Sequence, residues 1–191
     1  LSDAKISLGH IHLGGLGTKK DEVKAAELFE EMGRRGNTQC QYLAGKLAYE
    51  GHTPEGTPDA ERAAYWFLKA AEGGDADAMV QMAKMYQEGE GVEQSDHQSI
   101  VMMGRAALAG DNNALSEIAR YSETLDQHLA DLTRDAPTTI AFDDDRRAAY
   151  IATVKSLSSL QNTVMNVAEK LERAGMLYID RSNHIPPHEL N

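Results

Sequence analysis

The sequence is poor in several kinds of residue, and each shortage excludes a class of protein. Cys40 is the only cysteine among 191 residues, so no intramolecular disulfide can form. No apolar run approaches the roughly 20 residues that a membrane-spanning helix needs. Lys and Arg number 19 against 30 Asp and Glu, which gives a formal net charge of -11. That charge argues against general nucleic-acid binding and against attachment to an anionic membrane, because both depend on basic side chains.

Signs of β-structure are also scarce. Val, Ile, Thr and aromatic residues rarely alternate with polar residues over more than a few positions, which is the pattern of a half-buried strand. Residues 1–120 are instead rich in Ala, Leu, Glu, Lys and Met, which favour helices. We therefore expect an all-α protein.

Several sets of residues recur along the chain in the same register. The glycines Gly15, Gly51 and Gly89 are separated by 36 and then 38 residues. Because independent positions repeat together, chance is a poor explanation and the sequence predicts a repeat protein. The other sets are Gly36, Gly74 and Gly110; the pairs Leu28-Phe29, Trp66-Phe67 and Met102-Met103; and the column Ala4, Cys40, Ala78 and Ala114.

Each repeat is expected to form two helices. The first helices are predicted over about 4–13, 40–50 and 78–88, each of which ends near a glycine that can form a left-handed C-cap. The second helices are predicted to begin at Asp21, Asp59 and Ser95, because these side chains can accept hydrogen bonds from free backbone N–H groups. Helices this short are marginal alone and depend on stacking against their neighbours.

Several stretches of the sequence resemble the Sel1-like repeat, a relative of the tetratricopeptide repeat. They are Tyr49-Glu50-Gly51, Ala63 to Asp75, Met85 to Val92 and Ala106 to Asp111. The resemblance covers about residues 4–121 and implies an α-solenoid, a right-handed superhelix of helix-turn-helix units that serves as a scaffold or adaptor. Its units would be 4–39, 40–77 and 78–113, followed by a degenerate fourth unit or cap at 114–135. The repeat domain would therefore occupy residues 1–135.

The last third of the chain departs from the repeat. Pro137 indicates a linker over 136–142, and the lack of Pro and Gly after it predicts one long helix over 143–175. An extended tail is expected at 176–191. Two roles remain open for the helix. It packs against the open end or the side of the solenoid, or it forms a docking or dimerising coiled coil.

No group of residues predicts catalysis or metal binding. Cys40 occupies a position that is alanine in the other repeats, which favours a small packing residue over a nucleophile. His10 and His12 are two residues apart and lie on different faces of a helix, a poor arrangement for a metal ion. We expect no enzyme activity, no catalytic residue, no metal and no cofactor.

A basic or potentially basic residue recurs in each unit, six positions after the residue of the alanine column. The four residues are His10, Lys46, Lys84 and Arg120, and they are accompanied by Leu13, Tyr42, Tyr49 and Gln87. In a groove lined by the first helices, this set would suit an extended acidic peptide or a free C-terminus. Alternatively, Lys46 with Glu50 and Lys84 with Glu88 form ordinary intrahelical ion pairs.

The sequence therefore favours a non-enzymatic scaffold that holds a segment of another protein in its concave groove. The alternative is a structural assembly component that oligomerises or docks through the long C-terminal helix. The oligomeric state and the compartment stay open, since a soluble bacterial protein of the periplasm, the exterior or the cytoplasm would fit. No nucleic acid and no membrane insertion are expected.

Overall fold

The computed structural model describes residues 2–134 and 144–176, and this part of the chain contains eight helices and no strand. Six helices form three hairpins: α1 (Ser2–Gly14) with α2 (Glu22–Arg34), α3 (Thr38–Tyr49) with α4 (Ala60–Glu72), and α5 (Ala76–Glu88) with α6 (Asp96–Leu108). Two longer helices follow, α7 (Asn112–Arg134) and α8 (Asp144–Arg173). The predicted linker, 136–142, and all but the first residue of the predicted tail, 176–191, lie outside the described residues.

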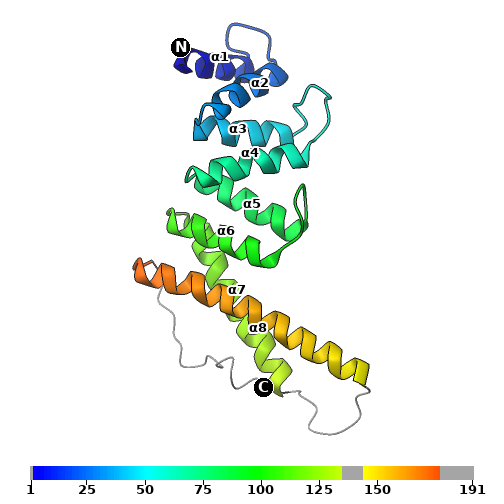
Figure 1. Ribbon diagram of the computed structural model, residues 1–191. Helices are drawn as coiled ribbons and strands as arrows, with labels where there is room; N and C mark the ends of the chain where they lie inside the picture. Colours follow the sequence, from blue (N-terminus) through cyan, green and yellow to red (C-terminus); the bar gives the residue numbers. More distant parts are fainter. Residues whose placement is uncertain (1, 135–143, 177–191) are drawn as a thin grey trace.

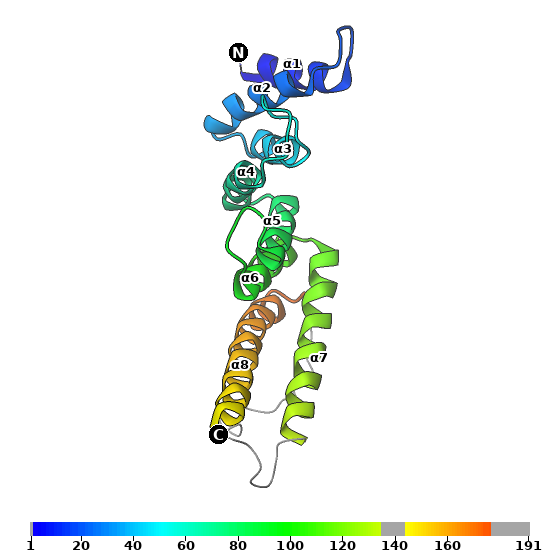
Figure 2. The same cartoon turned by 90° about the vertical axis from the view of Figure 1, so that its right-hand side faces the viewer.

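The helices stack in two layers. Helices α1 to α6 follow one another along the stack, with α7 and α8 at its far end (Figure 1). Seen from the side, α1, α3, α5 and α7 form one layer, and α2, α4, α6 and α8 form the other (Figure 2). Helix α8 returns antiparallel to α7 and occupies the place of a second helix in a fourth unit. The prediction of an all-α solenoid is confirmed.

The second helices begin where the sequence predicts. Asp21, Asp59 and Ser95 are their N-caps and accept hydrogen bonds from the backbone nitrogens three residues later, at 2.9, 2.9 and 3.3 Å. Each such bond satisfies one of the backbone N–H groups that a first helical turn leaves without a partner, and replacing such a cap by alanine costs about 1 kcal/mol.

The first helices begin earlier than the sequence analysis predicted. Helices α3, α5 and α7 start at residues 38, 76 and 112 because Asn37, Asp75 and Asp111 cap them, with side-chain oxygens 2.7 to 2.8 Å from the capped nitrogens. Each cap follows a glycine with positive φ, at 90°, 94° and 101° for Gly36, Gly74 and Gly110. A Gly-Asx pair thus ends one helix and starts the next.

Within a hairpin, a glycine lies opposite a phenylalanine. A Cβ atom added at Gly9 would lie 2.7 Å from Cε1 of Phe29, and one added at Gly45 would lie 2.8 Å from Cδ1 of Phe67. Both rings are buried, so the missing side chain provides the space that the ring fills. Trp66, of the recurring pair Trp66-Phe67, is also buried.

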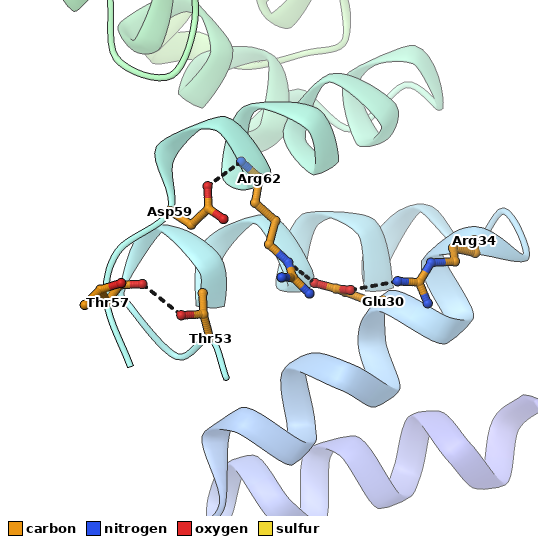
Figure 3. A network of polar contacts seen from close by, with 6 residues as sticks. All are labelled: Glu30, Arg34, Thr53, Thr57, Asp59 and Arg62. Atoms are coloured by element: carbon orange, nitrogen blue, oxygen red, sulfur yellow. Dashed lines mark hydrogen bonds and ion pairs between the residues drawn. The ribbon is translucent and has the colours of Figure 1, made fainter. Parts of the chain in front are cut away.

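A buried carboxylate joins the first two hairpins. Glu30 of α2 accepts a hydrogen bond from Nε of Arg62 in α4 at 2.6 Å and one from Nη2 of Arg34 at 3.0 Å (Figure 3). The bond to Glu30 raises the pKa of Arg62, and the Arg34 guanidinium also lies 5.9 Å from the centre of the Trp66 ring. Because a buried charge is tolerated only when it is paired, Glu30 depends on these two arginines, and its contact with Arg62 links α4 to α2.

Helix α8 packs against α6 and α7 of its own chain. Val164, Val167, Ala168 and Leu171 are buried, and a Cβ atom added at Gly104 of α6 would lie 2.2 Å from Cγ1 of Val167. The second half of α8 thus packs against the end of the stack, as the first of the two expected roles requires. None of the helices in residues 2–134 and 144–176 has the length and apolar character to cross a membrane.

Candidate protein-binding surface

The four basic positions lie on the layer formed by the first helices. His10 is on α1, Lys46 on α3, Lys84 on α5 and Arg120 on α7, and all four are exposed. Since they occupy equivalent positions in successive units, they form a line of positive or potentially positive charge along one face of the stack. We call this line the basic ladder.

Ion pairs within the helices account for only part of the basic ladder. Nζ of Lys46 lies 3.9 Å from Glu50, at the outer limit of an ion pair, and Arg120 pairs with Glu117. In the described part of the chain, Lys84 makes no ion pair, and the pair with Glu88 that the spacing allows is not formed. Intrahelical pairing is therefore a weak explanation for the recurrence of these residues.

The residues that accompany the ladder differ in how accessible they are. Leu13 is half-buried against the core of the first two hairpins. Tyr42 is half-buried, its ring centre 5.7 Å from that of Phe67, and burial followed by nearby carboxylates raises its pKa. These two side chains contribute mainly to packing.

Tyr49 and Gln87 are exposed. The hydroxyl of Tyr49 donates a hydrogen bond of 2.8 Å to Glu90 in the turn after α5, and this bond is the main reason that its pKa is raised. The Tyr49 ring therefore stands at the surface, held across the junction of two units. A ring fixed in this way loses little conformational entropy when a partner binds.

A cleft of about 280 Å³ lies between α5, α6 and α7. Its apolar lining comes from Ile100, Met103 and Ile118. Of the eight residues predicted from sequence, only Gln87 and Arg120 line it. The remaining polar lining consists of Asp96, Ser99, Glu117, Tyr121 and Thr124. Such a cleft has room for a side chain of a bound segment, with polar groups around it to fix orientation.

The sequence analysis missed the cleft, although the repeat columns hold a signal for it. Ser99 and Met103 stand where the preceding unit has Ala63 and Phe67. Tyr121 stands where the preceding units have Leu47 and Met85, and it is only half-buried, while those two are 3 % exposed. The third and fourth units thus replace core residues by polar or more flexible ones at a single junction.

The described candidates for chemistry are Cys40 and the metal-binding types of side chain. Cys40 is fully buried, and burial raises the pKa of its thiol, which opposes formation of a nucleophilic thiolate. Among the described residues, no group of His, Cys, Asp and Glu is placed to hold a metal ion. The surface offers charge, aromatic area and a cleft.

Comparison with known proteins assigns the repeat. Residues 2–37, 38–75 and 76–111, more than half of the chain, each match the family model of the Sel1 repeat. Their limits follow the Gly-Asx caps and lie two residues before the unit limits expected from the alanine column. No curated protein matches the sequence.

Two solved structures are similar to this one. A Sel1 repeat protein from Oxalobacter formigenes has 28% identity and a TM-score of 0.55, over 63% of this chain and 34% of that chain. A protective antigen of uropathogenic Escherichia coli strains with an SLR fold has 20% identity and a TM-score of 0.54, over 95% of this chain and 36% of that chain. The second likeness concerns the fold alone. The chain spans about a third of the length of either protein.

Proposed function

Because the chain belongs to the Sel1 repeat family, whose members are generally protein-interaction scaffolds, we propose that it binds an extended acidic segment of another protein along the basic ladder. The observation that carries the proposal is the exposure of all four ladder residues together with the absence of an ion pair at Lys84 among the described residues. A lysine without a partner on an acidic protein is available for a carboxylate of a ligand.

The cleft between α5, α6 and α7 supports the proposal by lying at one end of the same line. Arg120 belongs to the basic ladder and also lines the cleft, where Ile100 and Ile118 provide an apolar floor. We therefore expect a bound segment to place a carboxylate at Lys84 or Arg120 and an apolar side chain in the cleft. Extended peptides are commonly recognised through hydrogen bonds to their main chain and through pockets for alternate side chains.

The alternative, assembly through the long C-terminal helix, has less support. The second half of α8 is buried on α6 and α7, where Val164 and Leu171 are 1 % and 0 % exposed. Pairing through this second half would require α8 to leave its position and expose its own core contacts. The basic ladder needs no such rearrangement.

The proposal can be tested with short random peptides displayed on phage and selected against the chain. Selected peptides should be enriched in Asp and Glu and should also contain an apolar residue. The double variant Lys46→Glu/Lys84→Glu should weaken binding of a selected peptide by about tenfold or more in fluorescence anisotropy, because attraction becomes repulsion at two sites. Its helicity and melting temperature should stay close to those of the parent, since both side chains are exposed.

A matched control separates the ladder from net charge. Lys24→Glu/Lys170→Glu makes the same change in charge at two exposed positions on α2 and α8, in the other layer. This variant should keep nearly full affinity. Equal losses in both double variants, or selected peptides without acidic residues, would contradict the proposal.

A further inference from the structure

One stripe of each internal first helix is buried against the unit before it. In α3 the stripe consists of Cys40, Ala44 and Leu47, which are at most 3 % exposed and share an apolar cluster with Ala25, Ala26, Phe29 and Met32 of the preceding α2. The equivalent residues Ala78, Met82 and Met85 of α5, and Ala114 and Ile118 of α7, are likewise buried. At three junctions, then, the same positions are covered by a preceding second helix.

The first helix of the chain carries the same apolar stripe without the cover. Its residues are Ala4, Leu8 and Ile11, which are equivalent to Cys40, Ala44 and Leu47. Ala4 is exposed, Leu8 is 41 % exposed and Ile11 is half-buried. The apolar character of the stripe is thus retained at a place where the described chain covers it only in part.

The turn after α1 is uncovered as well. In the third unit, the turn glycine Gly91 presses on the preceding unit, because a Cβ atom added there would lie 2.2 Å from the carbonyl oxygen of Ala60 at the start of α4. Gly17 is its equivalent and has a similar φ of 73°, yet no atom lies within 4 Å of a Cβ added at that position. Leu16 beside it is 69 % exposed.

We propose that the α1 end face, defined as Ala4, Leu8, Ile11 and the Gly17 turn, binds the second helix of a further Sel1 unit, one that lies outside residues 1–191. Two independent observations, on the helix and on the turn, indicate the same missing neighbour. The occupant is a helix because three internal junctions place one there. This inference does not depend on which ligand the basic ladder binds.

A second copy of this chain is a poor occupant. Helices α2, α4 and α6 are each already covered by the first helix that follows them. Helix α8, which takes the place of a second helix in the fourth unit, has Val164, Val167 and Leu171 buried in its packing on α6 and α7. Another copy therefore offers no described second helix whose apolar stripe is free. The matched region of this chain spans about a third of each of the two similar solved structures, so both of those chains extend well beyond the matched region.

The experiment extends the full chain by one unit. A copy of residues 76–111 is joined directly ahead of Ser2. This unit is chosen because its second helix, α6, normally covers Ala114 and Ile118 of α7. Those two residues are the closest match to Ala4 and Leu8 of α1. Asp111 of the copy would then cap α1, as Asp111 caps α7 in the parent. Native-state hydrogen exchange of the α1 amides should slow by about tenfold or more, since an end helix gains a packed neighbour.

The matched variant is Leu8→Gln, made in both chains. It should leave α1 exchange nearly unchanged in the parent, where Leu8 is exposed, and remove most of the added protection in the extended chain. Unchanged α1 exchange on extension, or equal effects of Leu8→Gln in the two chains, would overturn the proposal.

Two further outcomes are decisive. If circular dichroism shows that the added copy of residues 76–111 does not form helices, a copy of residues 38–75 is used in its place. If neither extension slows exchange of the α1 amides, the proposal is overturned. Sedimentation of the parent chain should give a monomer or an assembly that Leu8→Gln does not alter. A dimer that Leu8→Gln dissociates would show that a second copy covers the α1 end face, contrary to the proposed source.

Discussion

The two ends of the helical stack differ in how much apolar surface they leave exposed. At the C-terminal end, α8 lies on α6 and α7, and Leu171 is 0 % exposed. At the N-terminal end, Leu8 of α1 is 41 % exposed although its equivalents in the other first helices are buried. A repeat unit cannot bury both of its faces by itself, so each end of an array needs either a cap or another unit. The described stack is therefore covered by α8 at one end and leaves apolar side chains of α1 exposed at the other.

The largest expected difference between the ends comes from the same substitution made at each. Leu171→Ala removes a fully buried side chain and should lower the free energy of unfolding by about 2–5 kcal/mol. Leu8→Ala removes an exposed one and should change it by less than about 0.5 kcal/mol. Urea unfolding followed by circular dichroism measures both. Similar losses at the two positions would mean that the N-terminal end is covered as well as the C-terminal end.

The close contact between α6 and α8 depends on the glycine at position 104, which has no side chain. Gly104→Ala places a methyl group against Val167 and should cost about 1–3 kcal/mol of unfolding free energy by overpacking. Val167→Ala in the same chain should restore part of this loss, giving a non-additive double-mutant cycle. If the two substitutions simply add, then α8 does not approach α6 this closely.

The repeat was predictable because its signals are local or periodic. Asp21, Asp59 and Ser95 cap their helices by interactions within one turn, and the columns of glycine and alanine report burial at a fixed spacing. Asn37, Asp75 and Asp111 form an equally regular column after the turn glycines. The matched repeats begin two residues before the alanine column, because the Gly-Asx caps and not the alanines mark where each first helix starts.

What the sequence could not show depends on contacts between distant residues. Gln161 interrupts the apolar pattern of α8, yet it is buried and donates a 2.6 Å hydrogen bond to Asp126 of α7. Its partner is 35 residues away, so no spacing rule finds it. The cleft likewise needs three helices at once. For the basic ladder, the position in each unit was predictable, but the lack of an ion pair at Lys84 within the described residues emerges only from side-chain positions.

A smaller difference is expected between two turn glycines. Gly91→Ala and Gly17→Ala impose similar backbone strain, because both residues have φ near 70°. Only the Gly91 variant also collides with the backbone at Ala60. Gly91→Ala should therefore be the more destabilising by about 1–2 kcal/mol. Thermal unfolding of the two variants measures the difference. Equal melting temperatures would contradict the packing of the turn between α5 and α6 on the start of α4.

The smallest effect concerns a titrating group near the capped end. Tyr121 stands where the earlier units have Leu47 and Met85, and burial, followed by the charge of Asp96, raises the pKa of Tyr121 above its ordinary 10.0. The folded state then holds this proton more tightly than the unfolded state. Its contribution to stability is present below about pH 10 and is lost as the pH rises through the folded pKa.

Ultraviolet difference titration measures this group, with Tyr121→Phe to assign its signal. Asp96→Asn should lower the pKa of Tyr121 only in part, because burial is the larger cause. Glu93→Gln removes the same charge from an exposed residue of the turn before α6 and should leave the Tyr121 pKa unchanged. An ordinary pKa for Tyr121 in the folded parent would mean that the cleft beside α7 is more open to water than its lining indicates. The C-terminal end would then be less well sealed than the burial of Leu171 implies.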